Sequence, residues 1–201
     1  MAWNGKEHAL KTASYKSLNG INERQLSEHH DVLYAGYVKK INEIRTLLQT
    51  ADPASSNATF SQLRELKLEE TFAQNGVRLH EGYFDNLGGD GKPAGKIADL
   101  IKRDFGSYEA WEAEFKAMGI AARGWVVLAY DWEEKRLRNY LCDVHNQGGV
   151  WDCTPILILD VYEHAYFLDF ATARKKYIDA FMANVDWKKV DSLYADKIEK
   201  R

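Results

Sequence analysis

The amphipathic segment at residues 22–49 sets the strongest limit on how this chain can fold. Its inward-facing positions recur every three or four residues, at Leu26, His29, Leu33, Tyr37, Ile41, Ile44 and Leu48. This spacing is typical of a long helix with one buried face. The segment therefore predicts a helix of several turns, and it places His29 inside the face that packs against the rest of the protein.

Two more helices are predicted before residue 90, one through residues 63–72 and one over 77–87. The second of these would put Val77, His80 and Phe84 on one face, so that another histidine points inward. Glycine and proline residues at 88–93 then end the helical pattern. We expect a domain boundary there, with an N-terminal helical domain at 1–89 and a C-terminal domain at 90–201.

The pattern changes in the second half of the chain. We expect helices within 96–116 with Ser107 as an N-cap, strands at 125–130, 136–142 and 155–161, and a helical region at 163–185 followed by an amphipathic terminal stretch. Helices, then three strands, then helices indicate an α+β fold rather than a doubly wound sheet. The prediction is an N-terminal helical hairpin followed by a small three-stranded antiparallel sheet flanked by helices.

Composition removes several classes of function. The 201 residues carry 27 basic and 30 acidic side chains, a net charge of -3, which disfavours binding to nucleic acid or to anionic membranes. No apolar run approaches the roughly 18 residues needed to span a bilayer, so we expect a cytoplasmic protein. Cys142 and Cys153 match no zinc motif and are expected to stay free thiols.

A metal site is the chemistry that the histidines indicate. Asp160 follows a run of branched apolar residues, and His164 comes four positions later, where the chain turns toward a helix. Each of these residues alone is more often a capping, surface or ordinary half-buried side chain. Together with the inward-facing His29 and His80, they would supply three imidazoles and one carboxylate, a donor set that leaves a coordination position open.

The motif at residues 160–166 identifies a family. Its sequence D-V-Y-E-H-A-Y resembles the D-V-W-E-H-A-Y signature of iron/manganese superoxide dismutases, with Tyr162 in place of the usual tryptophan. The resemblance extends from about residue 26 to 187 and includes His29-His30, Tyr37-Val38, the aromatic pair after His80, and later motifs in the family's order.

This resemblance implies a role for each matching residue. His29, His80, Asp160 and His164 would bind the metal, with one water or hydroxide as the fifth ligand. Gln147 would hydrogen-bond that solvent, Tyr37 would stand at the substrate gate, and Trp125 would form part of the cavity wall. Glu163 would contact the metal-bound histidine of a second subunit, and Arg174 would lie near the funnel mouth. With Lys175 and Lys176, Arg174 is also a candidate for attracting the anionic substrate.

The implied reaction converts superoxide to dioxygen and hydrogen peroxide as one metal ion cycles between two oxidation states. Manganese is preferred over iron, because Gly76 stands four residues before His80 and the glutamine, Gln147, lies in the sheet region. The implied assembly is a homodimer or tetramer formed through the Glu163 and His164 region.

Some positions depart from the family pattern. Leu33 and Tyr34 replace a His-His pair, Phe167 replaces a tyrosine, Val127 stands where a second cavity tryptophan is usual, and the first 20 residues lack the family's N-terminal segment. The proton route through those positions is therefore altered. Two alternatives stay open, a zinc hydrolase using the same donors and a catalytically weak family member that binds metal or a protein partner.

Overall fold

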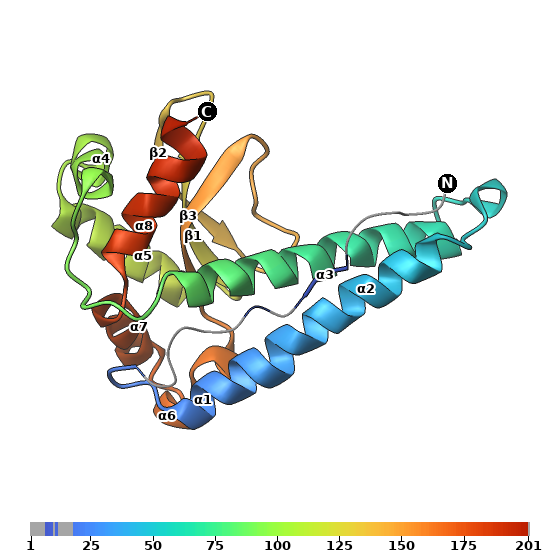
Figure 1. The fold of residues 1–201 in the computed structure, drawn as a ribbon, viewed down its shortest axis with the longest axis horizontal. Helices are drawn as coiled ribbons and strands as arrows, with labels where there is room; N and C mark the ends of the chain where they lie inside the picture. Colours follow the sequence, from blue (N-terminus) through green and yellow to red (C-terminus); the bar gives the residue numbers. More distant parts are fainter. Residues whose placement is uncertain (1–6, 10, 12–17, 201) are drawn as a thin grey trace.

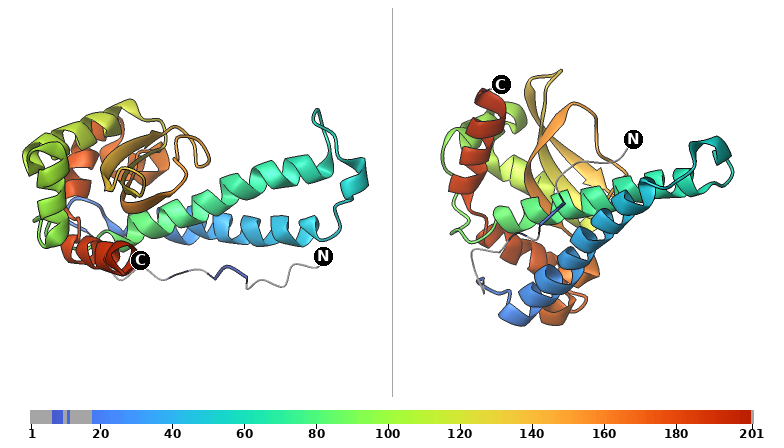
Figure 2. Two further views of the ribbon diagram at one scale, coloured as in Figure 1. Left: turned by 90° about the horizontal axis from the view of Figure 1, so that it is seen from above. Right: turned by 45° about the vertical axis from the view of Figure 1, so that its right-hand side comes forward.

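The computed structural model describes residues 7–9, 11 and 18–200. Two long helical segments lie side by side and project from a body that contains a three-stranded sheet and the remaining helices (Figure 1). Seen from above, the same arm extends well beyond the body (Figure 2). The predicted α+β fold, with its N-terminal helical region and its antiparallel sheet, is confirmed.

The first arm of the hairpin is continuous but not uniformly α-helical. It consists of α1 (Glu23–Ser27), a π-helical stretch η1 (Glu28–Tyr34) and α2 (Ala35–Leu48). The side chain of Asn22 caps its start by accepting a hydrogen bond from the backbone N–H of Gln25 at 3.0 Å. The wider turn of η1 coincides with the position of His29, as is common for π-helical segments at functional sites.

The second arm is one helix, α3 (Gln62–Asp85), where the sequence predicted two; a short 3₁₀ turn, η2 (Pro53–Ser55), precedes it. Nothing between residues 72 and 77 breaks the helix, because Gly76 costs only about 1 kcal/mol relative to alanine there. Gly76 has a packing role. A Cβ at this position would lie 2.7 Å from Cδ1 of Tyr37, so the glycine makes room for that ring.

The sheet has the order β2-β1-β3 and is antiparallel throughout. Its strands are β1 (Trp125–Asp131), β2 (Arg136–Cys142) and β3 (Cys153–Asp160). Trp125 pairs in register with Cys142 on one side and with Asp160 on the other. The start of the central strand is thus placed directly beside the end of β3.

The remaining helices surround the sheet. They are α4 (Lys96–Phe105), α5 (Tyr108–Ala121), η3 (Glu163–Ala165), α6 (Phe167–Phe170), α7 (Arg174–Ala183), α8 (Trp187–Tyr194) and η4 (Ala195–Glu199). Ser107 caps α5 as predicted, since its hydroxyl accepts from Ala110 N at 3.0 Å. The helical region predicted over 163–185 is broken into three. Tyr166, with a φ of -146°, separates η3 from α6, and Ala171, with a φ of 46° that no helix accommodates, ends α6.

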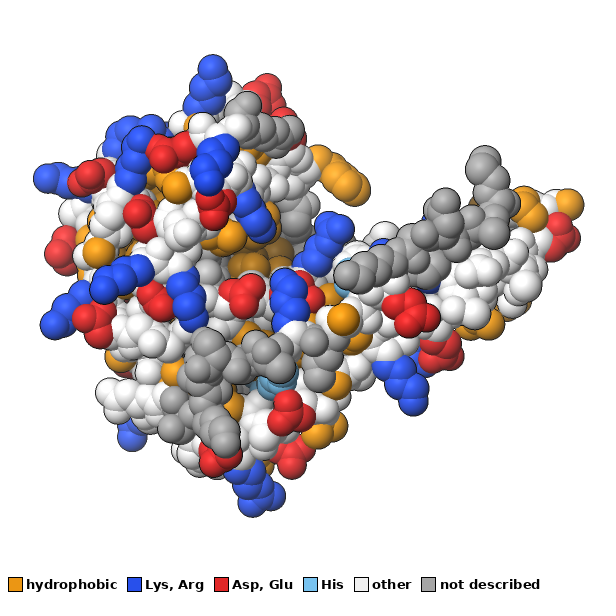
Figure 3. Space-filling view, in the orientation of Figure 1, with side chains coloured by type: hydrophobic (Ala, Val, Ile, Leu, Met, Phe, Trp, Pro, Cys, Tyr) orange, Lys and Arg blue, Asp and Glu red, His pale blue; other side chains and the backbone are white. Residues whose placement is uncertain are grey.

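Acidic and basic side chains are interspersed over the face seen in Figure 3, where no large region carries a single sign of charge. Within the described residues, none of the helices combines the length and the apolar character that a membrane span requires. The boundary near residue 89 stays a prediction, and the question about the first 20 residues falls mostly outside the described part of the chain.

Candidate metal centre

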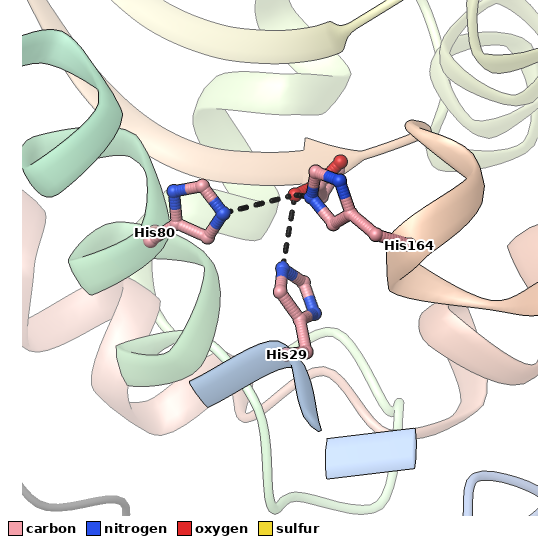
Figure 4. A group of neighbouring side chains, drawn as sticks. His29, His80 and His164 are labelled. Atoms are coloured by element: carbon pink, nitrogen blue, oxygen red, sulfur yellow. Dashed lines mark hydrogen bonds and ion pairs between the residues drawn. The ribbon is translucent and has the colours of Figure 1, made fainter. Parts of the chain in front are cut away.

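Four side chains from four separate elements converge inside the protein. His29 comes from η1, His80 from α3, Asp160 from the end of β3, and His164 from η3. One donor atom of each lies within 4.8 Å of the others. Figure 4 shows the three labelled imidazoles pointing toward one carboxylate oxygen. The structure thus brings together the four residues that the sequence predicted as ligands.

The distances define a single point of convergence at Oδ2 of Asp160. His29 Nε2 lies 3.1 Å from this oxygen, His164 Nε2 3.3 Å, and His80 Nε2 3.6 Å. His29, His80 and Asp160 are completely buried, whereas the His164 side chain is 25% exposed. The site is therefore enclosed on the helical side and reaches the surface beside His164.

Hydrogen bonds behind the donors fix their orientation. His80 donates from Nδ1 to the backbone oxygen of Gly76 at 2.6 Å, so its Nε2 carries a lone pair. That buried Nε2 has no hydrogen-bond partner among the described residues. Asp160 accepts from the backbone N–H of Tyr162 through its other oxygen, Oδ1, at 2.9 Å. A cation between this lone pair and the carboxylate would give the buried Nε2 of His80 the partner that it lacks.

The electrostatics of His29, His80 and Asp160 favour the protonation states of metal ligands. Burial lowers the pKa of His29, and it lowers that of His80 to about 3, so both imidazoles are neutral at pH 7. Burial opposes ionisation of Asp160, but the charge and the hydrogen bonds of the histidines outweigh it and hold the pKa of this carboxyl below its usual range. For His164, burial is outweighed by attraction to Asp160, which raises its pKa.

Three imidazole nitrogens and one carboxylate oxygen fit iron or manganese. Imidazole suits first-row transition metals, and the carboxylate adds a hard anionic donor that stabilises a higher charge. Four protein donors also leave a position open for an external ligand. The donor set, the neutral imidazoles of His29 and His80 and the unpartnered Nε2 of His80 all agree with a resident metal ion.

A second group of residues lies beside the donors and connects Trp125 with Tyr37 through His145. The indole Nε1 of Trp125 donates to Nδ1 of His145 at 2.9 Å, and Nε2 of His145 lies 2.7 Å from the hydroxyl oxygen of Tyr37. Because an indole N–H can only donate, Nδ1 must be the acceptor. The neutral ring therefore carries its hydrogen on Nε2 and donates it to Tyr37.

Gln147 does not occupy the position that the sequence analysis expected. It is exposed at a turn, where its backbone N–H bonds to Val144 O at 3.3 Å. The group that reaches Tyr37 and Trp125 is His145, which is 5% exposed and whose ring lies 5.9 Å from that of His80. His145 was missed because it lies in the loop after β2, where no periodicity tells which side chain turns inward.

Trp125 and Tyr37 both lie beside the cluster of four donors. The Trp125 ring meets that of His80 edge-on at 4.9 Å, and the Tyr37 ring lies 5.3 Å from the same imidazole. Phe72 closes the group by packing 4.4 Å from the His145 ring. These aromatic rings form one side of the cluster, which we call the gate side (Tyr37, Phe72, Trp125 and His145).

The other predicted residues lie outside the cluster of four donors. Glu163 is exposed, and Arg174 donates to the hydroxyl of Tyr166 at 3.1 Å and to Ala122 O at 2.8 Å. Phe167 is 47% exposed. Most of the Arg174 guanidinium is thus already engaged with the protein itself.

Tyr34, one of the positions that departs from the family pattern, turns away from the gate side. Its hydroxyl donates to Glu81 at 3.0 Å and accepts from the backbone N–H of Lys11 at 3.2 Å. A salt bridge of 2.7 Å between Lys11 and Glu81 completes this group. The Tyr34 hydroxyl is therefore engaged with Glu81 and Lys11 and not with a residue of the gate side.

The fold and the converging donors are those of a protein that can hold a metal ion in a largely buried site lined on one side by aromatic rings. Residues 93–193 match the family described as iron/manganese superoxide dismutases, C-terminal domain. A superoxide dismutase [Fe] of Aquifex aeolicus is 40% identical over 184 residues, covering 89% of this chain and 86% of the relative. The chain therefore belongs to the iron/manganese superoxide dismutase family, oxidoreductases that convert superoxide to dioxygen and hydrogen peroxide.

Relatives named for either metal are about equally similar to this chain. The superoxide dismutase [Fe] of Cupriavidus metallidurans is 41% identical, with 89% of this chain and 90% of the relative covered. The superoxide dismutase [Mn] of Haloarcula marismortui is 39% identical, with 89% and 87% covered. Overall similarity thus supports an iron or manganese cofactor without selecting between the two.

Proposed function

We propose that His29, His80, Asp160 and His164 hold one iron or manganese ion, and that superoxide is dismutated at this ion. The observation that carries the proposal is the convergence of four donor atoms within 4.8 Å, with a buried and unpartnered Nε2 on His80. A bound ion of either metal supplies one-electron chemistry, since it can accept an electron from one superoxide and return it to another.

Tyr37 and His145 are proposed to manage the protons that peroxide formation consumes. The Nε2–H of His145 is donated to the oxygen of Tyr37, so the hydroxyl hydrogen of Tyr37 remains available for another acceptor. Burial raises the pKa of Tyr37, which keeps this hydrogen in place at neutral pH. Trp125 fixes the imidazole from the opposite side and contributes the cavity wall.

The preference for manganese has lost one of its two supports. The first support, Gly76, lies four residues before His80 on α3, and it accommodates the ring of Tyr37. Gln147, the other support, is exposed, and the residue that lies beside Tyr37 and His80 is His145. We therefore propose a single ion, either manganese or iron, rather than manganese alone.

Assembly into a homodimer is proposed through the surface around Glu163 and His164. The carboxylate of Glu163 is exposed, and the apolar side chains of Phe167 and Leu168 beside it are 47% and 51% exposed. Apolar side chains beside an exposed acid are suited to an interface with a second copy. Sedimentation velocity tests this proposal, because a Phe167→Glu variant should sediment as a monomer if the surface is an interface.

Attraction of the anionic substrate is proposed to depend on Lys175 and Lys176, which are exposed next to Arg174, whose guanidinium is largely hydrogen-bonded to the protein itself.

A cytoplasmic location is also proposed. Cys142 and Cys153 are free thiols, as is usual in a reducing compartment. Cell fractionation with an antibody against the protein tests this location.

Separate loading with Mn²⁺, Fe²⁺ and Zn²⁺ tests the proposed function. Superoxide consumption should appear with manganese, iron or both, and be absent with zinc. A protein that purifies with zinc and hydrolyses esters or amides without consuming superoxide would instead be a metal-dependent hydrolase. A protein that binds iron and manganese but consumes no superoxide would be a non-catalytic family member.

A further inference from the structure

The hydroxyl of Tyr83 is a buried polar group that the roles above leave unused. Tyr83 lies on α3, three residues after His80, and none of its surface is exposed. A phenol in such a position requires a hydrogen-bond partner, because an unsatisfied buried hydroxyl is destabilising. The partner of Tyr83 leads directly to a proposed metal ligand.

Two phenols and a carbonyl form a chain whose direction can be deduced. The Tyr177 hydroxyl lies 2.7 Å from the backbone oxygen of Asp160 and 3.2 Å from the hydroxyl of Tyr83. Each phenol has one hydrogen, and a carbonyl can only accept. Tyr177 therefore donates to Asp160, and Tyr83 donates to Tyr177. Such a chain polarises each bond along it and strengthens the bond to Asp160.

The ring of Tyr83 also touches the opposite side of the cluster. Its centroid lies 5.0 Å from that of His29, with the planes tilted by 42°, and it stacks on Phe181 at 5.7 Å. Since Tyr83 shares a helix with His80, one side chain connects three of the four donors. His29 is met through ring packing, His80 through the backbone, and Asp160 through Tyr177.

We propose that Tyr83 is a positioning residue of the metal centre, which fixes the donors of the helical hairpin relative to Asp160 on the sheet. This inference rests on the proposed metal-binding role of the four donors. It requires that the Tyr83 hydroxyl act through Tyr177, because among the described residues no shorter chain of hydrogen bonds joins it to Asp160. Loss of the hydroxyl should make the position of Asp160 less well fixed and weaken metal binding, while the ring that remains leaves no cavity in the core.

The test measures the affinity of the purified full-length protein for Mn²⁺ by competition with a coloured chelator. Tyr83→Phe keeps the ring and its stacking on Phe181, and it should raise the dissociation constant about three- to tenfold, the equivalent of one hydrogen bond. Tyr108→Phe is the control. Tyr108 is a largely buried phenol that packs on Trp111 and Trp187 at 5.3 and 5.7 Å, and its loss should leave the affinity unchanged.

A double-mutant cycle separates positioning from general stability. In a Tyr177→Phe background, Tyr83→Phe should have no further effect on Mn²⁺ affinity, because the path to Asp160 is already cut. The positioning role is wrong if Tyr83→Phe binds Mn²⁺ like the wild type, or if its effect persists in that background. If the wild type binds neither manganese nor iron, the proposed function fails as well, so the two failures are distinguishable.

Discussion

The two sides of the metal centre are built from different kinds of backbone. On the ligand side, all four donors come from hydrogen-bonded elements: a π-helical stretch, an α-helix, a strand end and a 3₁₀ turn. On the gate side, Tyr37 and Trp125 are held by a helix and a strand, but His145 lies in the loop after β2. The periodicity of regular elements reveals which residues face inward, whereas a loop gives no such signal.

Removal of a ligand should have the largest effect. His80→Ala deletes a fully buried donor whose orientation is fixed by Gly76, and affinity for manganese or iron should fall by more than about 100-fold, beyond the range of changes outside the ligands. Metal content of the purified variant, measured by elemental analysis, provides the readout.

His8→Ala is the matched control for this variant. It removes an imidazole that bonds Gln74 on the same helix at 3.0 Å, outside the cluster. Its metal content should equal that of the wild type. Retention of full metal content by His80→Ala would show that the four residues are not the ligands.

Substitutions at His145 and Gln147 test which of the two residues acts on the gate side. His145→Ala removes the donor to Tyr37 and the acceptor for Trp125, and activity per bound metal should fall about 10- to 100-fold. Gln147→Ala changes an exposed side chain two positions later and should leave activity within twofold of wild type. The reverse order of effects would restore Gln147 and overturn the assignment of His145.

The sequence predicted all four residues that converge on the ligand side but only part of the gate side, for physical reasons. His29 and His80 fall on apolar stripes of helical period, and Asp160 ends a continuous apolar strand, so their inward orientation follows from local pattern. His145 faces inward because the chain folds back after β2 and because Trp125 and Tyr37 offer partners for both ring nitrogens. Those partners are 20 and 108 residues away, which no local pattern records.

The differences between predicted and observed secondary structure also have a non-local origin. The π-helical turn at 28–34 and the break at Ala171 depend on tertiary packing, and both occur inside segments with an unbroken helical pattern. The fold class was nevertheless accessible, because the order of helices and strands depends only on where each apolar period begins and ends.

The pH dependence of the free energy of unfolding, measured on the metal-free protein, compares the buried histidines of the ligand side with His145 on the gate side. His29, His80 and His145 have pKa values lowered by burial, the last two to about 3 and about 4, so the unfolded chain binds protons that the folded protein excludes. The free energy of unfolding should therefore fall as pH drops below about 6.5, by up to about 1.4 kcal/mol per pH unit for each such imidazole.

His164 and Asp160 do not cancel this slope. The raised pKa of His164 gives a contribution that is fully present below its unfolded pKa, and the lowered pKa of Asp160 gives one that is lost only in stronger acid. Urea unfolding at several pH values provides the measurement. His145→Gln should reduce the slope by about one third, since one of three imidazoles is removed. An unchanged slope would mean that His145 is protonated in the folded protein.

Loss of the Tyr37 hydroxyl should have the smallest effect. Tyr37→Phe keeps the ring that fills the space beside Gly76, but it removes the acceptor for His145 and the hydrogen that the gate side offers. One hydrogen bond corresponds to about a two- to tenfold change in rate, and metal content should be unaffected, because no ligand is touched. Stopped-flow decay of superoxide, compared in H₂O and D₂O, measures this rate. A Tyr37→Phe variant whose solvent isotope effect equals that of the wild type would place proton delivery elsewhere and leave the gate side with a purely structural role.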